Sequence, residues 1–291
     1  MRTGFPLGAD LISVIVTTYN RPDTLHASLR ALAQQTDRNF EVVVADDGSG
    51  PDTARVIEGW ASRLPVPVKH VWQEHRGFRG AEIRNRGIGA SRGSYCIFLD
   101  GDCLARGDFV AAHRRLAEPG WFVAGNRILL SRKLTEVVLA SDLPAESWDF
   151  SKFVRQRFCG GVNRLLPAIR APLGPLRKLH RGAWEGAKTC NLAVARSDLD
   201  RVDGFDTSYV GWGLEDSDLI VRLLHAGVRR KDGRFATGVL HLWHPEADRS
   251  GLPENETRFE EVLAGSRIRP MQGLTATREE QMASSRERAG H

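Results

Sequence analysis

The sequence predicts an α/β fold with a mostly parallel β-sheet flanked by helices. Short β-branched apolar runs alternate with helical segments in the first hundred residues, and crossover connections of this kind join parallel strands. Three of these runs end abruptly in polar clusters, and ligands gather beyond the carboxyl ends of strands in such sheets. The 291 residues are 41% hydrophobic and 26% charged, which excludes fibrous and disordered chains.

The elements expected in the first half follow one another closely. The run LISVIVTT at 11–18 predicts a buried strand, and Pro22 suits the first turn of a helix over 22–35. The same alternation continues to residue 99. The further elements expected here are a strand at 40–45, a helix at 52–63, a strand at 66–72, a helix at 81–91 and a strand at 95–99.

The second half is less regular. Residues 127 to 188 contain scattered basic residues, prolines and glycines without a clean period, which indicates an insertion. Regularity returns at CNLAVARSDL, followed by a helix that begins near Leu214 and a strand-like stretch at 236–240. We therefore expect one domain, and its parts are 8–126, a basic insertion at 127–190, 191–264, and a mobile polar tail at 265–291.

Positive charge is concentrated in one part of the chain. The formal net charge is +5, but residues 151 to 190 hold nine Lys and Arg against the single acid Glu185. Such a segment attracts nucleic acid, anionic lipid or a phosphorylated substrate, and charge alone does not choose among them. Because no aromatic residues of a recognised nucleic-acid module are interleaved with these cations, we expect no nucleic-acid partner.

The sequence also predicts a location. No window reaches the roughly 18–20 apolar residues that a membrane-spanning helix needs, and MRTGFPLGAD lacks the layout of a signal peptide. We therefore expect a cytoplasmic protein. Its four cysteines show no CxxC spacing, and we expect reduced packing residues rather than a zinc module or a disulfide framework.

The first polar cluster, Asp100-Gly101-Asp102, follows the apolar run YCIFL. Two carboxylates two residues apart can converge, and Gly101 leaves room for a phosphate. Converging anionic oxygens suit Mg²⁺ or Mn²⁺. The alternative is a solvated turn, which the position after a buried strand disfavours.

The second cluster is Asp46-Asp47-Gly48-Ser49. A carboxylate after a strand can accept hydrogen bonds from a nucleotide base or ribose, although helix capping and a turn explain the same residues. Other polar residues of the first half are candidates for the same nucleotide site: Thr17, Tyr19, Asn20, Arg21, Arg84 and Asn85, with Asp100 and Gly101.

The third cluster is GWGLEDSD, where Glu215 and Asp216 open a helix directly after Trp212. Acids at a helix N-terminus are favoured by the macrodipole without any function. An exposed indole beside carboxylates also suits sugar binding, because the ring covers C–H surfaces and the acids bind hydroxyls. One of these carboxylates can act as general base toward an acceptor hydroxyl.

The fourth cluster is His241-Leu242-Trp243-His244-Pro245. A neutral imidazole can complete the metal site begun by the aspartates, whereas a lone histidine is more often a packed or solvated residue. Both histidines therefore remain candidates.

Together these segments resemble the inverting glycosyltransferase family 2, of the GT-A fold, and within it the branch similar to bacterial chondroitin polymerase and animal β-1,4-galactosyltransferases. The resemblance covers residues 11 to about 110 and 186 to 250, and both the order and the spacing of the motifs agree. The matching segments are VTTYNRP, VVVADDGS, AEIRNRGI, YCIFLDGDC, CNLAVARSDLDRVDGFDTSYVGWGLEDSDL and LWHPE.

The resemblance implies a role for each motif. Asp47 with Asp46 would hold the nucleotide base and ribose, and Asp102 with Asp100 the metal on the diphosphate. Asp216 would be the catalytic base, with Glu215 beside it. His244 looks like the third metal ligand, with His241 as its rival. Sugar or acceptor contacts are expected from Trp212, Gly213, Asn191 and Trp243.

The implied activity is transfer of a sugar, with inversion, from a nucleotide-diphosphate donor to a hydroxyl of a glycan or glycolipid. Uridine diphosphate is the first donor to test, and the cofactor is Mn²⁺ or Mg²⁺. Residues 8–126 then form the nucleotide-sugar-binding half and 191–264 the acceptor and catalytic half, while the insertion at 127–190 is expected to form an acceptor lobe.

Similar enzymes act in the synthesis of surface polysaccharide and lipopolysaccharide, on lipid-linked acceptors. The basic insertion therefore adds the hypothesis of peripheral contact with an anionic membrane at its inner face, against an ordinary solvated surface. The rival functions are a catalytically silent sugar-binding protein on the same fold and a nucleotidyltransferase. A nicotinamide dehydrogenase is excluded because the first strand leads into TTYNRPD and supplies no GxGxxG turn.

Overall fold

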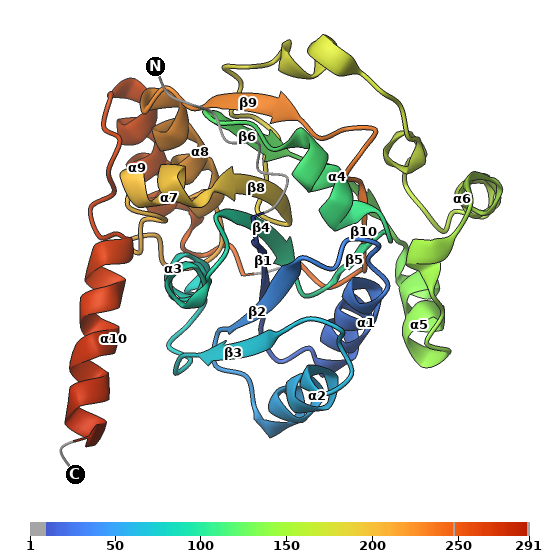
Figure 1. Cartoon of the computed structure of the whole chain (residues 1–291), viewed down its shortest axis with the longest axis horizontal. Helices are drawn as coiled ribbons and strands as arrows, with labels where there is room; N and C mark the ends of the chain where they lie inside the picture. The colour runs from blue at the N-terminus through green and yellow to red at the C-terminus, as the bar shows by residue number, and fades with distance from the viewer. Residues whose placement is uncertain (1–9, 247, 290–291) are drawn as a thin grey trace.

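The central sheet is seven-stranded in the part of the chain that the structure, a computed structural model, describes: residues 10–246 and 248–289. Its strands, in sequence order, are β1 (Ile12–Thr18), β2 (Phe40–Asp46), β3 (Val68–Trp72), β4 (Tyr95–Asp100), β6 (Trp121–Ala124), β8 (Asn191–Ala195) and β9 (Arg229–Asp232). The spatial order is β3-β2-β1-β4-β8-β6-β9, from bottom to top in Figure 1. All neighbouring pairs are parallel except the two that β8 makes.

Helices cover both faces of this sheet, which confirms the predicted α/β fold (Figure 1). The side chains of β1 alternate between two apolar cores, with Val14 and Val16 in one and Ile15 in the other. The first core includes residues of α1 (Pro22–Ala33), α2 (Pro51–Ala61) and α4 (Phe109–Leu116). The second includes residues of α3 (Gly80–Ala90), α7 (Arg196–Arg201), α8 (Glu215–His225) and α10 (Leu274–Ala289).

The strands and helices predicted for the first hundred residues are all present, with ends that shift by one or two residues. β3 begins at Val68 rather than at residue 66. Pro67 has no N–H to give to a ladder, and its carbonyl accepts the Val42 N–H at 2.9 Å just before the strand starts. Residues 8 and 9, which the predicted domain included, lie outside the described residues.

The segment 127–190 is more regular than the sequence indicated. Its elements are short, and two of its helices are capped locally: Ser131 accepts from the Leu134 N–H, and Asp149 from the Lys152 N–H. A helix of nine residues gives too few turns for a clear period, which explains why the pattern was missed. The elements are β7 (Arg127–Leu129), α5 (Arg132–Ala140), α6 (Phe150–Phe158) and the 3₁₀ turns η1 (Ala145–Ser147), η2 (Leu166–Ala168) and η3 (Gly174–Lys178).

A small second sheet joins this segment to the rest of the domain. β10 (Val239–His241) lies between β5 (Cys103–Ala105) and β7. β10 starts later than the predicted stretch at 236–240, because the N–H groups of Ala236 and Thr237 donate to the Gly233 carbonyl in a turn. The sheet packs on α5 and α6 through a third core that includes Trp148 and Phe153.

The C-terminal residues contain a helix where a mobile polar tail was expected. After α9 (Leu252–Ala264), α10 packs against α3 and runs down the left of Figure 1. Leu274 is 1% exposed, and the Thr275 N–H and hydroxyl both donate to Asp203. Leu274 and Thr277 are the buried positions among the residues of this helix whose burial the structure describes, and they leave almost no periodic signal in a largely polar sequence.

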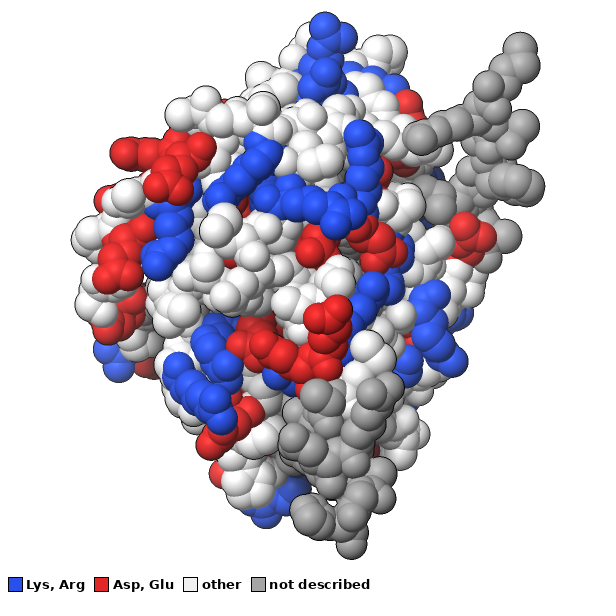
Figure 2. Space-filling view, turned by 90° about the vertical axis from the view of Figure 1, so that its left-hand side faces the viewer, with Lys and Arg blue, Asp and Glu red and all other residues white. Residues whose placement is uncertain are grey.

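Several composition-based expectations can be checked directly. None of the described helices is long and apolar enough to cross a membrane. The four cysteines are free thiols, and three of them are buried, but Cys159 is exposed and is not a packing residue. On the face shown in Figure 2, Lys and Arg are interspersed with Asp and Glu, so this side presents both signs of charge.

Candidate active site

A cleft of about 570 Å³ opens at the carboxyl ends of β1 and β4, beside the start of α8. Each of the clusters TTYNR, DDGS and DGD contributes residues to its walls, as the sequence predicted. The register of the parallel strands explains why: Thr17 on β1 pairs with Asp100 on β4, and Thr18 pairs with Asp46 on β2. Clusters that follow these strands therefore meet at one edge of the sheet.

Asp102, His241 and His244 form a group suited to a divalent metal. Their ligand atoms lie within 4.8 Å of one another, and the Asp102 carboxylate is 3.5 Å from Nε2 of each histidine. The Leu242 N–H donates to the Asp102 carbonyl at 2.9 Å, which ties the segment with both histidines to the DGD turn. Burial lowers the pKa of His241, so its imidazole is neutral and free to bind metal at neutral pH.

Asp100 lies outside this group, contrary to the prediction that both aspartates of DGD hold the metal. Its Oδ1 is 3.6 Å from Nη2 of Arg84. The chain turns at Gly101, whose N–H donates to the Thr17 carbonyl at 2.8 Å, and the two carboxylates meet different partners. Burial raises the pKa of Asp100, and Arg84 opposes that rise. Asp100 therefore forms an ion pair with Arg84, which also lines the cleft.

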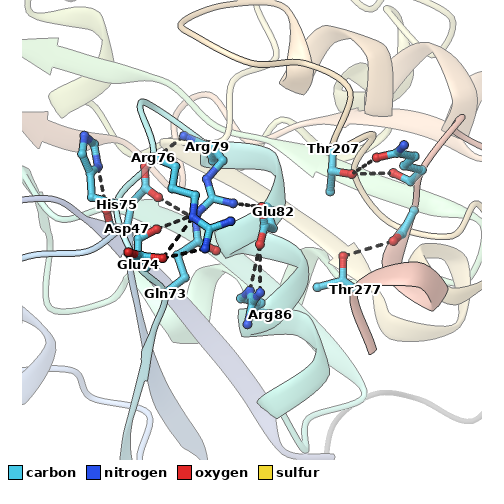
Figure 3. Close-up of polar contacts among 12 residues, drawn as sticks. Asp47, Gln73, Glu74, His75, Arg76, Arg79, Glu82, Arg86, Thr207 and Thr277 are labelled. Atoms are coloured by element: carbon cyan, nitrogen blue, oxygen red, sulfur yellow. Dashed lines mark hydrogen bonds and ion pairs between the residues drawn. The ribbon is translucent and has the colours of Figure 1, made fainter. Parts of the chain in front are cut away.

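Asp47 is held in the cleft by the loop that follows β3 (Figure 3). Its Oδ1 accepts from Gln73 Nε2 at 2.5 Å and its Oδ2 from the Arg79 N–H at 3.0 Å. Burial raises the pKa of Asp47, and these hydrogen bonds oppose the rise. The His75 ring, from the same loop, stacks on Tyr19 with centroids 4.1 Å apart, which presents a flat aromatic surface beside the carboxylate.

The side chains of Asp46 and Asn20 hydrogen-bond to neighbouring parts of the chain and do not line the cleft, contrary to the two nucleotide contacts predicted for them. Asp46 is 1% exposed, its Oδ1 accepts from the Ser49 N–H at 2.8 Å, and its Oδ2 lies 3.0 Å from His70. Asn20 accepts from the Gly50 N–H at 2.9 Å through its side chain. Successive side chains of an extended chain point to opposite sides, so of the two adjacent aspartates only Asp47 lines the cleft.

Glu215 and Asp216 enter the cleft from the first turn of α8. The residue before the helix, Leu214, has φ 74, an unusual left-handed conformation for a branched side chain. Burial and the neighbouring Asp216 raise the pKa of Glu215, while Arg84 Nη1, 2.9 Å from Glu215 Oε1, lowers it. Asp216 Oδ1 accepts from the Ser217 N–H at 2.7 Å and lies 3.4 Å from Lys188 Nζ.

The two tryptophans expected to bind sugar occupy different places. Trp212 lines the cleft beside Gly213, with 40% of its surface exposed. Trp243 is not among the residues lining the cleft, and the Arg132 guanidinium stacks on its ring at 5.1 Å. The geometry therefore leaves Trp212 as the aromatic surface beside the carboxylates.

Asn85 and Asn191 are structural, which corrects their predicted contacts with phosphate and sugar. Asn85 is fully buried, and its side chain exchanges hydrogen bonds of 2.9 and 2.8 Å with the Phe205 main chain. Asn191 is 1% exposed, and its amide donates to the carbonyls of Asn126 and Thr237. Neither side chain lines the cleft, so neither amide is placed to contact a ligand there.

Several residues that line the cleft were not identified from the sequence, among them Phe78, Arg127 and Lys188. Arg127 and Lys188 stand at the two ends of the expected insertion, and no strand-end motif marks them. Lys188 lies two residues before the matching segment that begins at Cys190, within the range 186–250 that the resemblance covers, so its position beside a motif was the one signal available.

A second hollow, of about 700 Å³, lies between α4 and residues 170–178. Its basic side chains are largely paired, because Lys178 and Lys231 both bind Glu118, and Arg170 binds Asp108. The metal-ligating group lies elsewhere. The smaller cleft at the strand ends is therefore the candidate active site.

The fold and this cleft define a glycosyltransferase of the GT-A type. Residues 13–166 match the model of glycosyl transferase family 2, and residues 179–244 match that described as the N-terminal domain of galactosyltransferase. The chain belongs to glycosyl transferase family 2. Membership confirms the resemblance read from the motifs and decides against the nucleotidyltransferase alternative.

Two relatives agree with this assignment. Validoxylamine A glucosyltransferase of Streptomyces hygroscopicus subsp. jinggangensis is 33% identical over 265 residues, covering 86% of this chain and 60% of the relative. Chondroitin synthase of Escherichia coli is 26% identical over 236 residues, covering 75% and 33%. The chain thus spans about 60% of the length of the first relative and a third of the second.

A solved structure has the same fold. A mannosyltransferase from Pyrobaculum calidifontis, in complex with GDP-Man and Mn²⁺, superposes with a TM-score of 0.59 at 19% identity, covering 88% of this chain and 65% of that one. At this identity the likeness establishes the fold.

Proposed function

We propose that the protein is an inverting, metal-dependent glycosyltransferase that moves a sugar from a nucleotide-diphosphate donor to a hydroxyl acceptor. The observation that carries the proposal is the sharing of one cleft by three kinds of group. Asp47 lies beside an aromatic surface, Asp102 belongs to a metal-ligating group, and Asp216 is a carboxylate open to an acceptor.

The metal would be held by Asp102, His241 and His244. A carboxylate with two imidazoles suits Mn²⁺ better than Mg²⁺, which prefers oxygen ligands alone. A bound divalent ion supplies Lewis-acid stabilisation of the charge that develops on a departing diphosphate. The negative charge of a diphosphate is consistent with a cleft that is lined by cations as well as by acids.

Asp216 is the proposed general base. The Ser217 N–H fixes Oδ1, which orients the carboxylate at the start of α8. In the transfer the acceptor O–H proton passes to Asp216, and the acceptor oxygen forms a bond to the anomeric carbon. The bond from that carbon to the diphosphate oxygen breaks on the opposite face, and its electron pair leaves with the diphosphate. One displacement of this kind inverts the configuration.

The donor would bind with its base near Asp47 and Tyr19 and its sugar toward Trp212. A buried carboxylate accepts N–H groups of a base, and the Tyr19–His75 stack offers it a flat surface. Uridine diphosphate sugars are the first donors to test, and guanosine diphosphate sugars the second, since the mannosyltransferase neighbour holds GDP-Man.

The acceptor is proposed to be a glycan or glycolipid hydroxyl in surface polysaccharide or lipopolysaccharide synthesis, approached from the cytoplasmic side. The segment 150–179 supports peripheral contact with an anionic membrane, because it presents exposed apolar side chains among its cations: Phe150, Phe158, Leu166, Leu176 and Leu179. Salt-sensitive co-sedimentation with phosphatidylglycerol vesicles is expected, and no binding at low salt would remove the membrane contact.

The test is a panel of nucleotide sugars with Mn²⁺, comparing the wild type with Asp102→Ala and Asp216→Asn. We expect one donor to be cleaved slowly in water, with loss in Asp102→Ala of at least about a hundredfold. Asp216→Asn should keep donor binding and lose turnover. If no donor binds or reacts, a catalytically silent sugar-binding protein becomes the better account.

A further inference from the structure

Arg127 is a cation of the cleft that lacks an anionic partner. Among the described residues, no carboxylate lies within ion-pair distance of its guanidinium. Its Nη1 donates to the Cys190 sulfur at 3.3 Å, and a cysteine sulfur is a weak acceptor. By contrast, Arg84 binds Glu215 and Lys188 binds Asp216.

The position of Arg127 is fixed by the small second sheet. It is the first residue of β7, opposite Val239 of β10, and its carbonyl accepts from Arg164 Nε at 3.0 Å. β10 ends two residues further on, at His241. The backbone that holds Arg127 is therefore hydrogen-bonded to the strand that delivers a ligand of the metal-ligating group.

The acid that interacts with Arg127 in the cleft already has another cationic partner. Arg127 interacts electrostatically with Asp100 but is not within ion-pair distance of it, and the Asp100 carboxylate is already paired with Arg84. Partial desolvation of a guanidinium that has only a thiol acceptor is unfavourable unless an anion binds there.

We propose that Arg127 binds the diphosphate of the donor and stabilises it as the leaving group. This inference rests on the proposed function and names a residue for the leaving-group side of the same cleft. A guanidinium fits phosphate through two parallel N–H donors, which a lysine cannot reproduce. When the bond from the anomeric carbon to the diphosphate breaks, the electron pair remains on the diphosphate oxygen, and Arg127 offsets the new charge.

The experiment compares binding of nucleoside diphosphates and monophosphates to the full chain without metal. Isothermal titration calorimetry with UDP, UMP, GDP and GMP in EDTA removes the contribution of any divalent ion. The variants are Arg127→Gln, Arg127→Lys and the control Arg201→Gln, which changes an exposed arginine of α7. Circular dichroism melting checks that each variant is folded.

The wild type and Arg201→Gln are expected to bind the diphosphate of the recognised base about tenfold more tightly than its monophosphate. In Arg127→Gln that preference should fall to about one while monophosphate affinity is unchanged, and Arg127→Lys should recover only part of it. A diphosphate preference that persists in Arg127→Gln overturns the inference and leaves the proposed function standing. A wild type that binds none of the four nucleotides in EDTA also overturns the inference, and one that binds none with added Mn²⁺ either overturns the proposed function as well.

Discussion

Arg84 connects two acidic groups at the floor of the cleft. Its Nη1 lies 2.9 Å from Glu215, and its Nη2 lies 3.6 Å from Asp100. Burial alone would lower the pKa of Arg84, but the charges of Glu215, Asp100 and Asp216 outweigh it and raise the pKa. Because Arg84 and Glu215 are both buried, each depends on the other to offset the cost of its desolvation.

Replacing Arg84 by Met is expected to lower the free energy of unfolding by about 3–5 kcal/mol at pH 7.5, because the Glu215 carboxylate loses its cation. The raised pKa of Glu215 sets the sign of the pH dependence: the loss should shrink as pH falls and Glu215 takes up a proton. Urea unfolding at pH 7.5 and 5.5 measures both values. The double variant Arg84→Met/Glu215→Gln should recover part of the loss, and a loss that does not depend on pH would contradict this role.

Single residues also show how far a motif predicts a contact. Asp47, Asp102 and Asp216 follow strands or open a helix, and all three line the cleft as the sequence predicted. Asp46 adjoins Asp47 and Asn85 adjoins Arg84 in the matching segments, yet the side chains of Asp46 and Asn85 bind His70 and the Phe205 main chain. Which side chain of a motif faces the ligand depends on contacts with segments distant in sequence, which one sequence does not specify.

Glu41 at the start of β2 connects two neighbouring strands and a loop. It accepts from the Ser13 hydroxyl of β1 at 2.8 Å and from the Arg92 N–H, before β4, at 2.5 Å. Burial opposes its charge, but these hydrogen bonds outweigh burial and lower the pKa of Glu41 below its ordinary value of 4.5. The Glu41 carboxylate therefore stabilises the amino ends of the central strands, at the opposite end of the sheet from the cleft.

The variant Glu41→Gln is expected to unfold about 1.5–3 kcal/mol more easily at pH 7, because an amide loses one of the two acceptor oxygens. For a carboxyl with a lowered folded pKa, this stabilisation is complete above the unfolded value and is lost as pH falls through the folded one. The difference between wild type and variant should therefore narrow below about pH 4.5. Guanidinium unfolding at a series of pH values tests this, and a gap that widens in acid would contradict it.

Elements of the first half were predictable because each strand is a compact apolar run followed by a polar turn. The sequence did not predict α5 and α6, because helices of nine residues show little periodicity of apolar positions. Trp148 and Phe153, which belong to the core beneath these helices, are also separated from each other in the sequence. Arg127 reaches the cleft as the first residue of β7, another short element of the same segment. The site therefore draws residues from a segment whose sequence shows no motif.

At the scale of the whole molecule, the C-terminal helix α10 packs along one side of the domain (Figure 1). α10 covers α3, and Leu274 inserts into the core that also contains residues of α7 and α8 (Figure 1). Asn85 of α3 and Asp203 near α7 hold the turn at Gly204 between these helices. The helix that carries Asp216 is thus supported by a core that includes Leu274 at the start of α10.

Replacing Leu274 by Ala is expected to lower the free energy of unfolding by about 2–4 kcal/mol, because a fully buried side chain leaves a cavity. The control Met271→Ala changes a side chain that is 73% exposed and should alter stability by less than about 0.5 kcal/mol. Thermal and urea unfolding of the two variants measure the difference. Equal stability of both would mean that α10 does not support the domain.

The anomeric configuration of the first sugar product tests whether the sugar is transferred by direct displacement. The recognised donor is cleaved with Mn²⁺ in a short single-turnover reaction, the metal is removed with EDTA, and the anomeric proton is observed at once by NMR. Direct displacement with Asp216 as the base predicts a product with the anomeric configuration opposite to that of the donor. The wild type should form this product, and Asp216→Asn should not. A product that keeps the donor's configuration, or one formed equally well without Asp216, would contradict direct displacement by a hydroxyl activated at that carboxylate.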